Sequence, residues 1–227
     1  FCMDRAGLSA SDGPTHHGLF DIAYLRCFPN VIAMAPANED ELADMMFTAT
    51  KQNHPTFIRY PRGAAEGVPV KELPQLIEVG KAVVQQEFAN NGKRKVGLFG
   101  LGAMNSTARK AAAQLADGFD VALINPRFTK PIDPAAHEKF GREAELIVTL
   151  EDHALMGGYG SAVLELLSEK AITTPVIRIG WPDQFIEHAS TPEELRAKYG
   201  LSVENTVAKV KAHFGETVSN AKQLAVV

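Results

Sequence analysis

Apolar and polar positions in residues 1–60 alternate between short strand-like runs and one amphipathic helix. Residues 31–35 form an apolar run that ends at Pro36, and residues 56–60 form another. Between them, Asn38 and Glu41 have the spacing of a helix capping box. Apolar residues then recur at the spacing of one buried helical stripe: Leu42, Met45, Met46 and Ala49. This succession of strand, helix and strand predicts a parallel α/β sheet.

A second α/β unit is predicted after a break in this pattern. Residues 67–78 contain Gly67, Pro69 and Pro74 without periodicity, so we expect a linker there. Residues 81–87 and 95–99 flank Asn91-Gly92, which favours a hairpin. Strands and helices then alternate, at helix 106–116, strand 121–124, helix 134–140, strand 146–150, helix 161–170, strand 175–179 and two helices after Thr191 and Ser202. We expect a mostly parallel sheet in this unit.

Composition and charge argue against several kinds of partner. Of the 227 residues, 45% are hydrophobic and 22% charged, and the formal net charge is -4. We therefore expect no nucleic-acid partner and no membrane attachment, and no apolar run is long enough for a membrane span. Cys2 and Cys27 are too few for a disulfide framework, so we expect a cytoplasmic location. The chain begins Phe-Cys-Met-Asp, within an apparent strand end, so we expect further chain upstream.

Polar residues that could carry chemistry are concentrated between residues 4 and 17. This segment combines glycines with eight polar side chains: Asp4, Arg5, Ser9, Ser11, Asp12, Thr15, His16 and His17. Loops that leave the carboxyl ends of parallel strands commonly bind ligands. Arg5 could hold a phosphate, and so could Arg62, which Pro61 and Gly63 hold in place after a strand. A polar surface loop and an ordinary turn arginine remain the alternatives.

Three further motifs are weaker candidates. Residues 100–105, Gly-Leu-Gly-Ala-Met-Asn, resemble the start of a dinucleotide-binding turn but lack its third glycine, so we do not expect NAD. The histidines and cysteines match no zinc spacing, so we expect no metal. Residues 157–161 could seat an anion at a helix N-terminus, although close helix packing is the favoured interpretation of their glycines.

Longer phrases resemble one enzyme family over residues 1–215. The chain is similar to the 1-deoxy-D-xylulose-5-phosphate synthases, which are transketolase-like enzymes that depend on thiamine diphosphate. The phrases that carry the resemblance are Asp4-Arg5-Ala6-Gly7-Leu8, Asp12-Gly13-Pro14-Thr15-His16-His17-Gly18, Arg59-Tyr60-Pro61-Arg62-Gly63, Arg127-Phe128-Thr129-Lys130-Pro131, Glu151-Asp152-His153-Ala154 and Gly180-Trp181-Pro182-Asp183.

The resemblance implies a domain organisation and an activity. Residues 1–66 would be the C-terminal half of a pyrimidine-binding domain, residues 79–215 a transketolase C-terminal domain, and residues 216–227 a tail. The family is a transferase that joins pyruvate to D-glyceraldehyde 3-phosphate, with loss of carbon dioxide. Its product, 1-deoxy-D-xylulose 5-phosphate, feeds isoprenoid and thiamine synthesis. The resemblance also implies a homodimer.

The resemblance assigns four residues. Arg5 and Arg62 match arginines that hold the phosphorylated acceptor, and Asp12 and His16 match a polar pair near the reacting carbons. The residues that bind thiamine diphosphate and Mg²⁺ are expected upstream of Phe1, in a missing diphosphate-binding domain. We therefore expect this chain to be inactive alone and to hold neither cofactor securely.

The sequence departs from the family pattern at one loop, and two alternative functions stay open. Residues 9–11 read Ser-Ala-Ser where the family commonly has Val-Gly-Ala, a loop change beside the expected site. A transketolase or the β-subunit of a 2-oxoacid dehydrogenase E1 shares the same two domains. A non-catalytic assembly module is the alternative from outside the enzymes.

Overall fold

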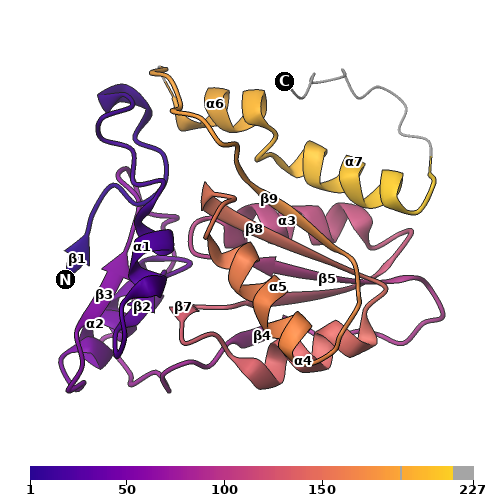
Figure 1. Cartoon of the computed structure of the whole chain (residues 1–227), viewed down its shortest axis with the longest axis horizontal. Helices are drawn as coiled ribbons and strands as arrows, with labels where there is room; N and C mark the ends of the chain where they lie inside the picture. Colours follow the sequence, from indigo (N-terminus) through magenta and orange to yellow (C-terminus); the bar gives the residue numbers. More distant parts are fainter. Residues whose placement is uncertain (190, 217–227) are drawn as a thin grey trace.

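The computed structural model describes residues 1–189 and 191–216, and two sheets flanked by helices make up its framework (Figure 1). The first unit contains β1 (Cys2–Met3), the 3-10 helix η1 (Ala10–Asp12), α1 (Asp21–Cys27), β2 (Ile32–Met34), α2 (Glu39–Ala49) and β3 (Thr56–Arg59). The second contains β4 (Val83–Gln86), β5 (Lys95–Gly100), α3 (Met104–Leu115), β6 (Asp120–Asn125), β7 (Phe128–Lys130), α4 (Pro134–Glu143), β8 (Leu146–Ala154), α5 (Tyr159–Glu169), β9 (Val176–Trp181), α6 (Pro192–Tyr199) and α7 (Val203–His213). The expected tail lies outside the described residues, except for Glu216.

The first sheet has the order β1-β3-β2-β7 and includes a strand from the second unit. β1 and β2 run parallel to β3, as the pattern of strand, helix and strand predicted. β7 pairs antiparallel with β2, with Met34 opposite Phe128, and no sequence signal had indicated this pairing. One strand of the second unit therefore completes the sheet of the first.

The second sheet has the order β4-β6-β5-β8-β9, and all its pairs are parallel except β4 with β6. The expected hairpin between residues 81–87 and 95–99 is wrong, because β6 lies between β4 and β5. The chain does turn near Gly92, but the amides of Ala89 and Asn90 each donate to the Asp120 carboxylate at 2.8 Å. Asp120 begins β6, so these bonds direct the loop toward β6.

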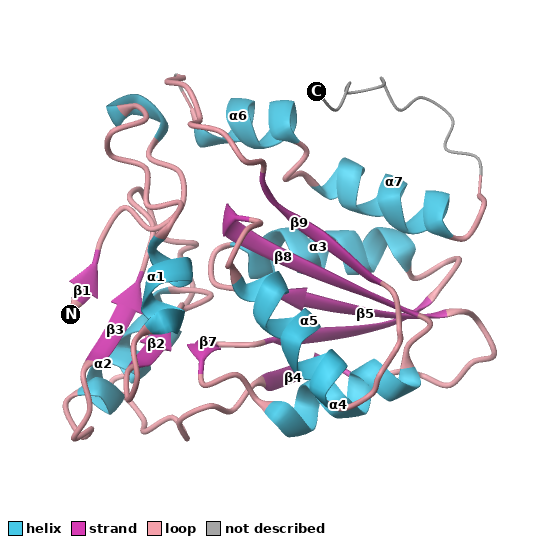
Figure 2. Ribbon diagram, in the orientation of Figure 1, coloured by secondary structure: helices cyan, strands magenta, loops and turns pink. Residues whose placement is uncertain are grey.

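Helices cover both faces of the second sheet, and each covering layer also contacts the first unit (Figure 2). The hydrophobic cluster that includes α3 and α7 also contains Leu8, Ala10 and Leu19, whereas the cluster that includes α4 and α5 contains Ile22 and Ala35. The two units are therefore joined by shared apolar cores. The division into residues 1–66, 67–78 and 79–215 remains a proposal.

The N-terminus of α2 connects the two units through a buried carboxylate. Asn38 caps the helix as predicted, because its side chain accepts a hydrogen bond from the Glu41 amide at 2.9 Å. Glu41 does not bind the Asn38 amide as a capping box would, and instead accepts from the amide of Ala37 at 2.7 Å. Glu41 also accepts from Asn125 at 3.0 Å and from Arg127 at 2.6 Å, and both residues belong to the second unit.

The expected linker follows one side of α2. Its backbone amides at Lys71 and Gln75 donate to Asp40 and Asp44 at 2.8 and 2.7 Å. The amide of Ile77 donates to the Thr48 hydroxyl at 2.8 Å. The three acceptors are four residues apart on α2, so they form one stripe along which this segment is docked.

None of the described helices is long and apolar enough to cross a membrane.

Candidate functional site

Two chain segments leave the first sheet side by side and carry the candidate arginines. β1 and β3 are parallel and in register, with Met3 opposite Arg59. Arg5 follows β1 and Arg62 follows β3, so both lie beyond the carboxyl ends of neighbouring strands. We call residues 4–18 the site loop. Its base is closed where the Gly18 amide donates to the Arg5 carbonyl at 3.1 Å.

Asp12 bridges the two arginines. Arg5 Nε donates to Asp12 Oδ2 at 2.9 Å, and Arg62 Nη1 donates to Asp12 Oδ1 and to Ser11 Oγ, the latter at 3.3 Å. The hydroxyl of Ser9 also donates to Asp12 Oδ2, at 2.9 Å. Hydrogen bonds from Arg62, Arg5 and Ser9 hold the pKa of the Asp12 carboxyl well below its usual range. The structure thus brings together three of the four residues that the sequence singled out.

His16 lies apart from this cluster. Its ring is exposed, and the only hydrogen bond of that ring among the described residues joins Nδ1 to Thr15 Oγ1 at 3.0 Å. Among the described residues, the carboxylate of Asp12 is bound by the two arginines and Ser9 rather than by His16. The expected position of Asp12 and His16 near the reacting carbons stays a prediction. The exposed ring remains available to a bound molecule.

The second unit packs directly against the site loop at Gly7. A Cβ at Gly7 would lie 2.3 Å from Asp152 Cγ, so only glycine permits this approach. The backbone φ of Gly7 is +76°, a second reason for glycine. Trp181 Nε1 donates to Asp152 Oδ1 at 2.7 Å, and Arg196 donates to Asp152 Oδ2 at 2.5 Å. Asp152 is thus a fixed carboxylate against which the loop is seated.

Arg59 is a buried junction residue that sequence reasoning missed. Its Nε and Nη2 donate to the two carboxylate oxygens of Asp21 at 2.7 and 3.1 Å. Nη2 also donates to the carbonyls of Gly18, at 3.2 Å, and Asp152, at 3.1 Å. The side chains of Arg59 and Asp21 are each only 5% exposed. This arginine therefore joins β3, the end of the site loop, α1 and β8.

The turn at residues 157–161 is occupied by a carboxylate of the chain itself. The amides of Tyr159 and Gly160 donate to Glu151 at 2.5 and 2.9 Å. A Cβ at Gly158 would lie 2.2 Å from Glu151 Oε2, so the glycine permits close packing. Burial raises the pKa of Glu151 to about 7, although the two amides oppose this shift. The turn thus binds a carboxyl group of the chain itself.

The glycines near residue 100 have a packing role as well. A Cβ at Gly100 would lie 2.7 Å from the Cβ of Ala108 in α3. Within residues 1–189 and 191–216, no group of three or more His, Cys, Asp or Glu side chains is placed to hold a metal ion.

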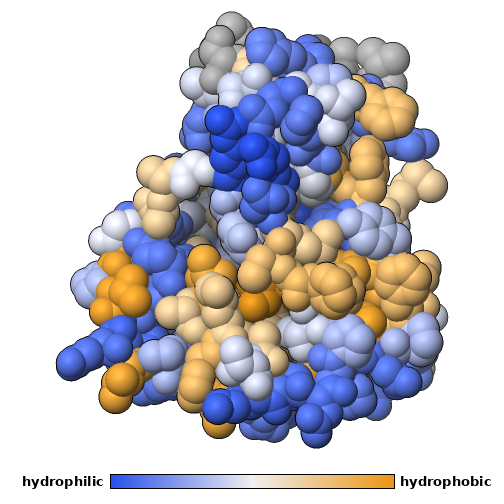
Figure 3. Space-filling view, turned by 90° about the vertical axis from the view of Figure 1, so that its left-hand side faces the viewer, coloured by the Kyte–Doolittle hydropathy of each residue, from blue (hydrophilic) through white to orange (hydrophobic). Residues whose placement is uncertain are grey.

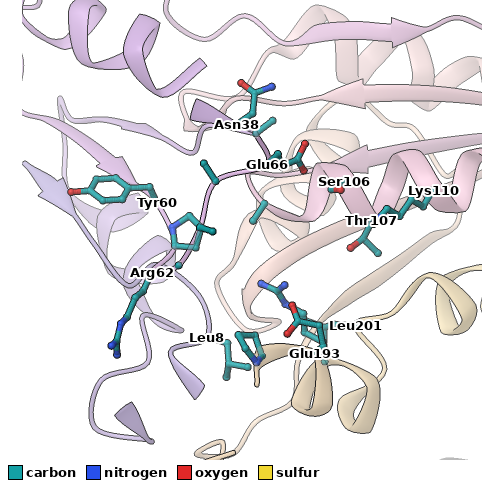
Figure 4. Close-up of a pocket in the computed structure, with 18 of the residues that line it drawn as sticks. Leu8, Asn38, Tyr60, Arg62, Glu66, Ser106, Thr107, Lys110, Glu193 and Leu201 are labelled. Atoms are coloured by element: carbon teal, nitrogen blue, oxygen red, sulfur yellow. The ribbon is translucent and has the colours of Figure 1, made fainter. Parts of the chain in front are cut away.

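A cleft of about 970 Å³ separates the two units near this site. Its walls include Asn38 from the first unit and Ser106, Lys110 and Leu201 from the second. In Figure 4 the side chain of Arg62 lies at the edge of the cleft and points away from it. Arg62 thus lines the edge of the cleft, while its guanidinium is hydrogen-bonded to Asp12.

An apolar band crosses the face that the first unit presents in Figure 3. Large exposed apolar side chains of this unit include Phe1, Phe20, Tyr24, Phe28 and Met46, which are 75%, 43%, 47%, 50% and 48% exposed. An exposed apolar band is typical of a protein interface.

Comparison with known proteins identifies both units. The family model for "Transketolase, pyrimidine binding domain" matches residues 1–67, and the model for "Transketolase, C-terminal domain" matches residues 81–206. The solved structure described as "Split gene transketolase, inactive beta4 tetramer" superposes with a TM-score of 0.78 at 32% identity. That match covers 93% of this chain and 65% of the other.

Two curated relatives give a finer comparison. The 1-deoxy-D-xylulose-5-phosphate synthase of Acidobacterium capsulatum is 51% identical over 211 residues, which are 92% of this chain and 33% of the relative. The enzyme of the same name from Methylacidiphilum infernorum is 52% identical over 208 residues, which are 91% of this chain and 32% of the relative. The chain thus spans about a third of the length of these relatives. The chain therefore belongs to the transketolase family, and over nearly all of its length it is similar to the 1-deoxy-D-xylulose-5-phosphate synthases.

Proposed function

We propose that this chain supplies the acceptor-binding site of an enzyme that condenses pyruvate with D-glyceraldehyde 3-phosphate. The products would be carbon dioxide and 1-deoxy-D-xylulose 5-phosphate. The observation that carries the proposal is the convergence of Arg5 and Arg62, from segments far apart in sequence, on one partly exposed carboxylate. The identity to synthases of two bacteria supports the choice of reaction.

The two arginines suit a phosphate dianion because each guanidinium can donate two parallel hydrogen bonds to oxygen. In the present arrangement Asp12 supplies the negative charge between them. The acceptor phosphate would replace Asp12 as the partner of Arg62, whose side chain is 48% exposed. Ser9 and Arg5 would continue to hold Asp12 after this exchange.

His16 is proposed to transfer protons at the reacting carbons. Histidine changes protonation near neutral pH, and the exposed ring of His16 is available to a bound aldehyde or hydroxyl. Thiamine diphosphate, when bound with Mg²⁺, would supply the electron sink for loss of carbon dioxide. No described residue is assigned to either cofactor, and we propose that a diphosphate-binding domain outside this chain holds both.

The same comparison supports a proposal for assembly. The split-gene transketolase chain was solved as an inactive tetramer of its β chains. We propose that this chain alone is likewise inactive and that its apolar band pairs with a second copy in a cytoplasmic homodimer.

A fusion enzyme tests the proposal. The segment of the Acidobacterium capsulatum synthase that precedes its matched region would be joined to this chain, which is 51% identical to the part replaced. The fusion is expected to release carbon dioxide and form product from pyruvate and glyceraldehyde phosphate, and the 227-residue chain alone is expected to form none. A folded fusion that used a ketose-phosphate donor and no pyruvate would instead be a transketolase.

A further inference from the structure

His17 has a defined protonation pattern that the proposed function does not use. Its Nδ1 lies 3.0 Å from the backbone nitrogen of Ser9. A backbone N–H can only donate, so Nδ1 accepts this bond and the ring proton is on Nε2. Nε2 lies 3.4 Å from the carbonyl oxygen of Glu187, which can only accept. The half-buried ring therefore connects the site loop to the second unit in a single tautomer.

Ser9 extends this connection to the arginines. It is only 3% exposed, and its hydroxyl donates to Asp12 Oδ2 at 2.9 Å. Asp12 in turn accepts from Arg5 and Arg62. An unbroken series of hydrogen bonds thus runs from the Glu187 carbonyl through His17, Ser9 and Asp12 to both arginines.

The surrounding backbone supports this connection. The amide of Ala189 donates to the carbonyl of Ala10 at 3.3 Å, and a Cβ at Gly13 would be 3.8 Å from the Cβ of His188. Figure 2 shows the segment before α6 beside the loop that carries η1. Residues 187–189 of the second unit therefore lie against the site loop at Ala10, Gly13 and His17.

We infer that His17 and Ser9 are positioning residues through which the second unit fixes Asp12 and, with it, the two arginines. Within the described part of the chain, His17 makes its hydrogen bonds to Ser9 and Glu187 and not to Arg5 or Arg62, so it would act through the loop. The hydroxyl of Ser9 is the link between the loop backbone and the carboxylate. The expected effect of His17 and Ser9 on acceptor binding rests on the proposed function. Their role in positioning Asp12 does not.

The positional role is tested on the 227-residue chain by nitrogen NMR without ligand. Wild-type His17 is expected to be protonated at Nε2. The Arg5 Nε–H signal is expected to be sharp, because this proton is hydrogen-bonded to Asp12. His17→Ala and Ser9→Ala should each broaden the Arg5 Nε–H signal or increase the rate at which its proton exchanges with water severalfold. The double variant should show no larger effect than either single variant. His17→Asn should preserve it, because Asn Oδ1 can replace Nδ1 as the acceptor. The exposed His54→Ala is the matched control.

A ring protonated at Nδ1, or an Arg5 signal unchanged by His17→Ala, would overturn the inference. If His17→Ala does not fold, the wild-type tautomer and the His17→Asn spectrum still decide it. In the fusion enzyme, His17→Ala and Ser9→Ala are each expected to raise the acceptor KM about fivefold, the size of one lost hydrogen bond, while kcat and the pyruvate KM stay within about twofold. A full effect of His17→Ala in the Ser9→Ala background would refute the connection through Ser9. A fusion without activity would count against the proposed function alone, because the NMR result does not depend on catalysis.

Discussion

Replacement of Arg59 by methionine tests how much the buried junction contributes to stability. Methionine keeps most of the side-chain volume and removes the four hydrogen bonds that Arg59 donates, at 2.7, 3.1, 3.2 and 3.1 Å. Asp21, whose side chain is 5% exposed, would then be a buried carboxylate without its partner. Removing one partner of a buried ion pair typically costs about 3–5 kcal/mol, so we expect a loss of that size in the free energy of unfolding.

Urea denaturation of three variants separates the ion pair from the lost packing. Asp21→Leu alone should cost a similar amount, because it leaves the guanidinium unpaired. The double variant should be less destabilised than the sum of the two by at least about 2 kcal/mol. Arg142→Met is the control and should cost about 1 kcal/mol or less, since this arginine is 53% exposed and its partners among the described residues are Glu138 and a carbonyl. A loss below about 1 kcal/mol for Arg59→Met, or additive effects in the double variant, would refute the reasoning.

Three further changes test other parts of the account. Gly7→Ala should destabilise the chain by about 1–3 kcal/mol more than Gly67→Ala in urea titrations, because both glycines have positive φ but only the first would meet a carboxylate carbon at 2.3 Å. Since burial raises the pKa of Glu151 from its ordinary 4.5 to about 7, the folded chain holds this proton more tightly than the unfolded chain. The difference in free energy of unfolding between the wild type and Glu151→Gln should therefore change by up to about 3 kcal/mol, to the disadvantage of the wild type, as the pH rises from 4.5 to 7. If the free energies of unfolding of the two proteins changed in parallel with pH, this prediction would be wrong. His16→Ala should lower kcat of the fusion enzyme about 100-fold with little change in the acceptor KM, and an unchanged kcat would remove His16 from the chemistry.

The placement of Arg5 and Arg62 was predictable from the sequence for a physical reason. Apolar runs of strand length around an amphipathic helix imply parallel strands, and residues that follow neighbouring parallel strands share one edge of the sheet. The structure has this arrangement, with β1 and β3 in parallel register. Their link through Asp12 was not predicted, because the sequence resemblance placed Asp12 with His16 near the reacting carbons and indicated no arginine partner for it.

Features that depend on pairing between distant segments were not predictable. The Asn91-Gly92 turn favoured a local hairpin, but the carboxylate of Asp120 and the strand it begins occupy the place beside β4. Nothing in the pattern near Arg59 distinguishes a buried arginine from a surface one, since its partner Asp21 is 38 positions away. The role of His17 likewise depends on a carbonyl 170 positions away. Local periodicity contains no information about such contacts.

Acceptor kinetics of the Arg62→Ala fusion enzyme test the central claim most directly. Arg94→Ala is the control, because its side chain is 59% exposed and belongs to the second unit. If Arg62 holds the phosphate, its loss should weaken acceptor binding by roughly 2–4 kcal/mol, which raises the KM for glyceraldehyde phosphate about 30-fold or more. Release of carbon dioxide from pyruvate without acceptor should change less than about threefold, because no acceptor phosphate is then bound. An acceptor KM equal to that of the Arg94→Ala control would contradict the proposed site.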